Sequence, residues 1–166
     1  GEGFARVYDG SVDIGAFEFQ PRFVEIDVKP GSDPNSINLA ANGVIAVAIF
    51  TTGDFDASLV DASTVVFAGA SAVHSALEDV DGDGDLDLVL HFRVEDTNLA
   101  DIYAQLLADD LDEDGILDSN HQTTEVSLIG QTATDEYFQG FDDLDLFLSG
   151  KNLRELLEDL AEAGVI

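Results

Sequence analysis

Aspartate recurs at alternate positions in two short segments of the chain. Residues 79–87 read DVDGDGDLD and residues 110–118 read DLDEDGILD, so both fit the pattern D-x-D-x-D-G-x-x-D. Ca²⁺ takes roughly six to eight oxygen ligands, and alternate carboxylates on a tightly curled loop can all point towards one ion. The glycine permits the sharp turn that such a loop needs. The two segments therefore predict two calcium sites.

The predicted ligands are the carboxylates at loop positions 1, 3, 5 and 9 and the backbone carbonyl at position 7. They are Asp79, Asp81, Asp83, Asp85 and Asp87 in the first segment and Asp110, Asp112, Asp114, Ile116 and Asp118 in the second. Position 12, where an EF-hand has a bidentate glutamate, holds Leu90 and His121 instead. Without that glutamate we expect weak sites, with dissociation constants on the order of 10⁻⁴ to 10⁻³ M, which calcium outside the cell can fill.

The two segments resemble different calcium loops of known proteins. The first runs directly into the strand-like sequence LDLVLHF, and in this it is similar to the calcium loops that precede strands in integrin-type β-propellers. The second, DLDEDGILDSN, resembles thrombospondin type 3 repeats and dockerin loops. A dockerin needs a helix after each loop, so the strand pattern after the first segment argues against that assignment.

Acidic residues dominate the charge of the chain, with 35 Asp and Glu against 6 Lys and Arg and a formal net charge of −29. This charge repels phosphate backbones and anionic lipid headgroups, so we expect no nucleic acid and no membrane partner. Cations are the expected partners instead. A salt-adapted surface screened by diffuse ions would also explain the excess of acids, but it would not explain their regular spacing in the two segments.

Motifs for catalysis or membrane insertion are missing from the sequence. The absence of cysteine excludes thiol catalysis and cysteine zinc sites, and neither G-x-S-x-G nor H-E-x-x-H occurs. His74, His91 and His121 are too scattered to predict a zinc site or a catalytic triad. No apolar run approaches the roughly 20 residues that span a bilayer, and the first residues lack the features of a signal peptide. We therefore expect a protein without enzymatic activity.

Apolar patterning predicts an all-β fold, an antiparallel β-sandwich of jelly-roll or immunoglobulin-like type. One or two short strands are expected within residues 3–20, and further strands over residues 22–28, 44–50, 63–69, 86–94, 124–132 and 142–149. The segment 44–50 is continuously apolar and suits a central strand. In the segment 86–94 the alternation places Asp87, His91 and Arg93 on a solvated face.

Two helices are expected, a short internal one over residues 99–109 and an amphipathic one over residues 152–163. The second has leucines at positions that share one helical face, with Ser149 as its cap and Gly164 after its last turn. The chain then divides into an N-terminal strand segment (1–20), a calcium-binding sandwich (21–150) and a C-terminal helix packed on the sandwich (151–166).

A longer stretch resembles a widespread domain of secreted bacterial and archaeal proteins. The resemblance covers residues 22–150 and rests on the motifs KPGSDPNSIN, GVIAVAI, FDASLVDASTV and LEDVDGDGDLDLVLHF. Members of this family usually lie near the C-terminus of exported, surface-attached or matrix proteins, and no activity is firmly attached to them. The resemblance implies an extracellular or cell-surface location and calcium binding. The second acidic segment and the LADIYAQLLADD before it are similar to an insertion relative to the shortest members.

The opening sequence YDGSVDIGAFEFQ resembles the end of right-handed parallel β-helix proteins of bacterial surfaces. This resemblance implies that the chain is either the tail of a longer ancestor or a processed product, whose first segment has lost its β-helix. An apolar strand without its original partner needs another sheet edge, so we expect the segment 12–19 to add to a sheet of this chain or of a neighbouring subunit.

Together these observations predict an exported, calcium-stabilised structural or adhesive protein. The favoured form is a self-associating subunit of an extracellular matrix, surface layer or filament, with other surface or matrix proteins as further partners. The alternative is a non-catalytic carbohydrate-binding accessory module, which would bind polysaccharide. The absence of Trp and the presence of only 3 Tyr leave few side chains that stack on sugar rings and weaken this alternative.

Overall fold

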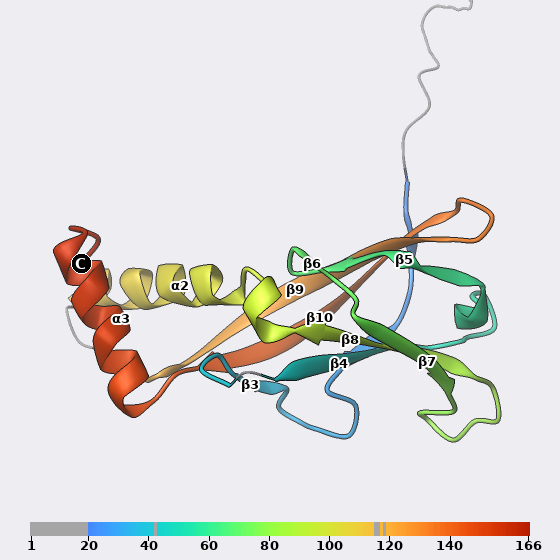
Figure 1. The fold of residues 1–166 in the computed structure, drawn as a ribbon, viewed down its shortest axis with the longest axis horizontal. Helices are drawn as coiled ribbons and strands as arrows, with labels where there is room; N and C mark the ends of the chain where they lie inside the picture. Colours follow the sequence, from blue (N-terminus) through green and yellow to red (C-terminus); the bar gives the residue numbers. More distant parts are fainter. Residues whose placement is uncertain (1–19, 42, 115–116, 118) are drawn as a thin grey trace, which may run out of the picture.

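Two β-sheets face each other across a shared core (Figure 1). The computed structural model describes residues 20–41, 43–114, 117 and 119–166. The six-stranded sheet contains β1 (Arg22–Phe23), β10 (Tyr137–Phe147), β9 (His121–Thr132), β5 (Val60–Phe67) and β6 (Ala70–Ser71) in that order, and β3 (Ser36–Asn38) also pairs with β10. The four-stranded sheet contains β2 (Ile26–Val28), β4 (Val44–Ile49), β8 (Asp87–Arg93) and β7 (His74–Glu78) in that order. The prediction of a mostly β, sandwich-like fold is confirmed, whereas the jelly-roll or immunoglobulin-like type stays a prediction.

Most neighbouring strands run antiparallel. In the long β9–β10 hairpin, Tyr137 pairs with Gln131 near the turn and Phe147 pairs with His121 at the far end. β1 and β3 pair with β10 in parallel, so the six-stranded sheet is mixed. β4 lies between β2 and β8, as its continuously apolar sequence predicts for a central strand.

The segment 22–28 contributes to both sheets instead of forming the single strand that its alternation predicts. Its first part is β1, in which Phe23 pairs with Gln139 of β10, and its second part is β2, in which Val28 pairs with Val47 of β4. Alternation identifies the buried face of a strand but not its partner, which is why the sequence does not reveal the break. As a result, the first four strands of the described chain lie alternately in the two sheets.

Helices α2 (Leu99–Asp114) and α3 (Gly150–Glu162) lie together at one end of the sandwich (Figure 1). The buried Leu99, Tyr103 and Leu107 of α2 belong to the same core as the two sheets. α3 contacts α2, and the half-buried Leu153, Leu156 and Leu157 form the apolar face that the sequence predicts. Within the described residues, neither helix is long and apolar enough to cross a membrane. Two short 3-10 turns, η1 (Ala57–Leu59) and η2 (Val94–Asp96), complete the fold.

Gly140 of β10 lies where β2 crosses the six-stranded sheet. A Cβ atom there would be 2.6 Å from Cγ2 of Ile26 and 3.2 Å from the carbonyl oxygen of Val24. The Ile26 side chain would have to move, and the Val24 carbonyl cannot rotate away as a side chain can. Gly140→Ala is therefore expected to lower the free energy of unfolding by about 1–3 kcal/mol, measured by urea unfolding. Gly53→Ala is the matched control, since nothing lies within 4 Å of its Cβ position. Equal losses in the two variants would contradict the prediction.

Candidate metal centre

The first acidic segment forms the loop between β7 and β8. Two glycines let this loop curl, since Gly82 has φ +77° and Gly84 has φ +97°, a region that side chains disfavour. The curl directs backbone N–H groups onto Asp79, whose Oδ1 accepts from Gly82 at 2.9 Å and from Asp83 at 3.1 Å. Its Oδ2 accepts from Gly84 at 3.0 Å. The backbone therefore holds the Asp79 carboxylate inside the loop.

Asp87 anchors the other end of the loop, at the first residue of β8. The alternation predicts a solvated position, but this side chain is completely buried, while the apolar Leu86 is 50% exposed. Hydrogen bonds explain the reversal. The Asp87 Oδ2 accepts from the backbone N–H of Val80 at 2.9 Å, and its Oδ1 accepts from the backbone N–H of Thr51 at 2.9 Å. One carboxylate thus joins the loop to the chain that follows β4.

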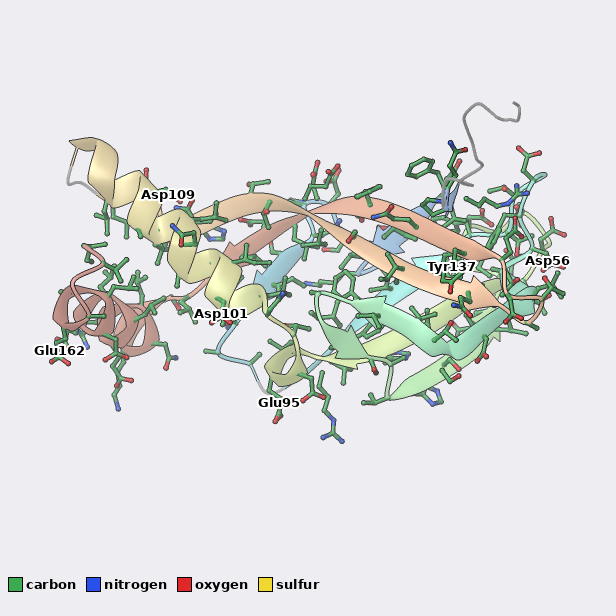
Figure 2. All side chains as sticks on the ribbon, turned by 90° about the horizontal axis from the view of Figure 1, so that it is seen from above. Asp56, Glu95, Asp101, Asp109, Tyr137 and Glu162 are labelled. Atoms are coloured by element: carbon green, nitrogen blue, oxygen red, sulfur yellow. The ribbon has the colours of Figure 1, made fainter. Side chains whose placement is uncertain are left out.

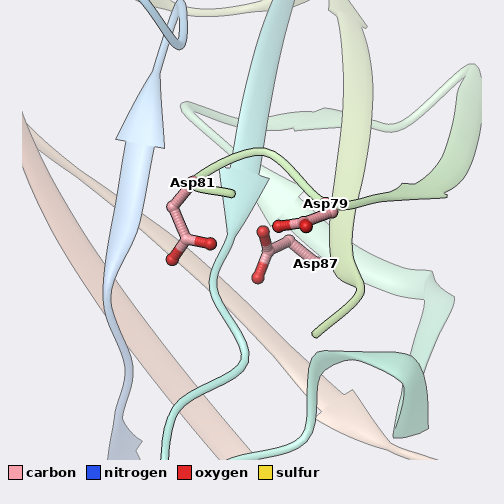
Figure 3. A group of neighbouring side chains, drawn as sticks. All are labelled: Asp79, Asp81 and Asp87. Carbon is pink, nitrogen blue, oxygen red and sulfur yellow. The ribbon is translucent and has the colours of Figure 1, made fainter. Parts of the chain in front are cut away.

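Three carboxylates of this loop converge. One oxygen from each of Asp79, Asp81 and Asp87 lies within 4.8 Å of the others, and Figure 3 shows the three side chains pointing towards a common region. Desolvation raises the pKa of Asp81 above its ordinary value. The hydrogen bond from the backbone N–H of Asp83 opposes this rise, and the Asp83 and Asp87 carboxylates add to it. Carboxylates held this close repel one another unless a proton or a cation is shared among them. The triad could therefore hold a metal ion.

The other predicted ligands of the first loop lie outside this triad. The side chains of Asp83 and Asp85 are exposed, and Asp83 accepts a hydrogen bond from the backbone N–H of Asp85 at 2.9 Å. The loop pattern assigns Asp85 a backbone carbonyl ligand, so its side chain does not have to face the triad.

The second acidic segment begins inside a helix. α2 continues to Asp114, so Asp110, Asp112 and Asp114 have helical backbone where the sequence predicts a loop. The predicted helix end at residue 109 is wrong because the half-buried Leu111, one turn after the buried Leu107, extends the apolar face of the helix.

The rest of the second predicted site cannot be placed in the fold. Ile116 and Asp118 lie outside the described residues. The second calcium site therefore stays a prediction.

Thr51 is a structural residue of the site that the sequence does not indicate. Besides its N–H bond to Asp87, its hydroxyl donates to the carbonyl of Leu86 at 2.6 Å and accepts from the backbone N–H of Ala57 at 2.9 Å. These bonds connect the end of the loop, the chain just after β4 and the start of η1. No local motif marks a threonine that acts 36 residues away in sequence.

Asp56 and Asp61, two acids in the chain after β4, accept hydrogen bonds within their own turns. Asp56 accepts from the backbone N–H of Ser58 at 3.0 Å, and Asp61 accepts from the backbone N–H of Ser63 at 3.1 Å. Each carboxylate therefore caps a local turn. Among the described residues, neither belongs to the group of acids that could hold a metal.

A second concentration of acids lies where β2 meets β10. The Oδ2 of Asp142 accepts from the backbone N–H of Val28 and from the side chain of Asn35, both at 2.9 Å. Desolvation raises the pKa of the half-buried Asp27, and repulsion from Asp142 and Asp33 raises it further. The folded protein therefore binds a proton at Asp27 more tightly than the unfolded chain does.

Asp27→Asn is expected to become more stable than the parent protein as pH rises above 3.8, the ordinary pKa of the group. The raised pKa makes the parent lose stability as pH rises from 3.8 through the folded value, whereas asparagine does not titrate. Urea unfolding in EDTA over about pH 3 to 7 measures the difference. Asp101→Asn controls for the loss of one exposed negative charge. A stability difference that does not change with pH would contradict the prediction.

Comparison of the chain with protein-family models, with curated proteins and with solved structures finds no match. The resemblances to secreted domains and to β-helix ends therefore stay predictions. The site itself is a loop with three converging carboxylates, one of which, Asp87, is the first residue of β8 in the four-stranded sheet.

Proposed function

We propose that this protein is an exported, calcium-stabilised structural or adhesive domain that works at the cell surface or outside the cell. The observation that carries the proposal is the convergence of Asp79, Asp81 and Asp87, with Asp87 fully buried and bonded to Thr51. A cation at this triad would fix the loop, the start of β8 and, through Asp87, Thr51 in the chain that follows β4. The ion would then act as a structural element of the sandwich.

Calcium is the cation that the loop suits best. All three converging ligands are carboxylates, which as hard oxygen donors suit Ca²⁺, Mg²⁺ or Mn²⁺ better than soft metals. Ca²⁺ accepts flexible geometry and more ligands, so the Asp83 side chain, the Asp85 carbonyl and water could complete its shell. Mg²⁺ requires near-ideal octahedral geometry and gives up its waters reluctantly, which makes it the poorer match.

The expected calcium affinity of the site supports a location outside the cell. A site without a bidentate glutamate belongs with the weak calcium sites of extracellular modules, with a dissociation constant on the order of 10⁻⁴ to 10⁻³ M. Cytosolic calcium would leave such a site empty. The net charge of −29 fits the same setting, because divalent ions can bridge acidic surfaces that otherwise repel one another.

Self-association is supported by an open sheet edge. β7 is the outer strand of the four-stranded sheet, and within the described part of the chain β8 is its one partner. The unpaired backbone groups of an edge strand offer a template to an added strand. We propose that residues 12–19 of a neighbouring subunit, whose apolar sequence suits a strand, add to such an edge.

Assembly in calcium tests the proposed function. Light scattering and electron microscopy are expected to reveal ordered polymers of the full chain in millimolar calcium and dispersed protein in EDTA. Deletion of residues 1–20 is expected to abolish assembly and to leave the calcium-dependent rise in melting temperature. Dispersed protein in calcium would contradict the self-association role, and unchanged assembly after the deletion would contradict the role of the N-terminal segment.

A further inference from the structure

The outer face of the six-stranded sheet carries exposed apolar side chains at the end that is remote from α2. Phe23 of β1 is 71% exposed, Phe141 of β10 is 43% exposed and Ile129 of β9 is 47% exposed. The rings of Phe23 and Phe141 lie 6.2 Å apart between centroids and are inclined by 32°. Figure 2 labels Tyr137 at this same end of the sheet, opposite the end where the helices lie. The strands here present an aromatic surface.

Near their shared turn, β9 and β10 carry no charged residue on the outer face of the sheet. The outward residues from the turn inwards are Gln131, Ile129 and Ser127 on β9 and Tyr137, Gln139 and Phe141 on β10. The next outward pair along the hairpin is Asp143 with Glu125. Arg22 and Glu136, at the rim, neutralise each other in an ion pair of 2.7 Å. Asp61 of β5, which pairs with Gln131, is an exposed carboxylate beside these outward positions. The six outward positions of β9 and β10 themselves carry no charge in a chain with a net charge of −29.

A shallow hollow lies in the same face. Its volume is about 220 Å³, and its lining includes Pro21, Ile129, Gln131 and Gln139. It is smaller than the roughly 300–1,000 Å³ of pockets that enclose a drug-sized ligand. The hollow combines apolar walls with two side-chain amides, each of which offers both hydrogen-bond donors and an acceptor. Such a site suits one ring of an extended ligand that rests on the sheet.

We propose that this face binds a neutral polysaccharide, with pyranose rings lying on Phe23 and Phe141 and hydroxyl groups bonded to Gln131 and Gln139. Sugar rings have an apolar C–H face that packs on aromatic rings and a hydroxyl edge that needs donors and acceptors, and the sheet supplies both. This proposal names the partner of the adhesive role proposed above, and it does not depend on calcium.

The charge of the chain favours a neutral glycan over a second copy of the chain or an anionic polysaccharide. A second copy, with its own net charge of −29, would need bridging cations to approach, and this face offers few carboxylates to bind them. An anionic polysaccharide would meet the repulsion of the whole chain. A neutral glycan meets no such repulsion. A neutral ligand also explains why the carboxylates, common on the rest of the chain, stay off these outward positions.

Affinity electrophoresis and titration calorimetry of the full chain against soluble glycans test the proposal. Hydroxyethyl cellulose, β-glucan and galactomannan are the neutral probes, and alginate and polygalacturonate are the anionic ones. We expect binding to at least one neutral probe and to neither anionic probe. The double variant F23A/F141A is expected to weaken that binding about tenfold or more. Leu77→Ala, which removes a 45% exposed side chain from the other sheet, is the matched control and should bind as the parent does.

Three results would overturn the proposal. They are binding to anionic probes alone, no binding to any of the three neutral probes, and equal binding by the parent and the double variant. A concentration-dependent dimer that the double variant loses, without glycan binding, would assign the face to a second copy instead. The rise in melting temperature on adding calcium should be the same for all variants, so failure here leaves the calcium proposal intact.

Discussion

Asp87→Ala is expected to lower the free energy of unfolding by about 2–4 kcal/mol. The substitution leaves the backbone N–H groups of Val80 and Thr51 without the acceptor that each now has at 2.9 Å. An unsatisfied, partly buried donor costs about 1–3 kcal/mol, and relief of repulsion within the triad offsets part of the sum. The same variant should lose its response to calcium, because it lacks the buried member of the triad. Urea unfolding with and without calcium measures both effects.

Two control variants separate these effects. Asp85→Ala removes an exposed side chain and keeps the backbone carbonyl, so its stability should stay within about 0.5 kcal/mol of the parent. Asp81→Ala removes an exposed ligand, so it should fold normally in EDTA and lose the calcium response. If Asp87→Ala unfolds at the same urea concentration as the parent, the carboxylate is not the anchor of the loop.

Calcium is expected to raise the melting temperature by about 5–10 °C for each occupied site. At about 10 mM free ion and a dissociation constant of about 0.1 mM, binding to the folded state alone adds about 2.7 kcal/mol. For a domain of this size, each kcal/mol raises the melting temperature by roughly 2–4 °C. Calorimetric scans in CaCl₂ and in EDTA measure the shift, and titration calorimetry gives the number of ions bound.

Salt at matched ionic strength is the decisive control. Diffuse screening would let NaCl raise the melting temperature as much as CaCl₂ does, whereas a discrete site requires the divalent ion. MgCl₂ should have a smaller effect than CaCl₂. A melting temperature unchanged by thorough chelation would refute the calcium proposal. A stoichiometry of one ion that Asp81→Ala abolishes would restrict binding to the first loop.

Much of the fold can be predicted from apolar patterning, because most long strands carry it. The segments that become β4, β8 and β9 are all predicted to within a few residues. β7 is not predicted, since HSALE lacks alternation and lies at an exposed edge where no face is fully buried. β3 is not predicted because its isoleucine, buried at Ile37, stands alone within a run of turn-forming residues. Short strands form mainly because a neighbouring strand pairs with them, so their own sequences show little apolar alternation.

The site, too, can be predicted only in part, because its geometry depends on contacts between distant parts of the chain. The spacing of the acids identifies the first loop and three converging carboxylates, but it treats the four carboxylates at positions 1, 3, 5 and 9 as equivalent. Burial of Asp87 and the contribution of Thr51 depend on the pairing of β4 with β8, which brings Thr51 next to a residue far along the chain. In the second segment the spacing is the same, yet the apolar face of α2 holds the first acids in a helix. Local spacing therefore predicts a loop only where packing leaves the backbone free to form it.

The alternation of the first four strands between the sheets bears on how the protein would carry mechanical load. If the amino end is tethered, tension enters the described fold at β1, a short strand that pairs with β10 in parallel. The chain then passes straight into the opposite layer at β2, returns at β3 and crosses again at β4. Because consecutive strands belong to different sheets, a force applied at this end is expected to act on both sheets and not on one alone.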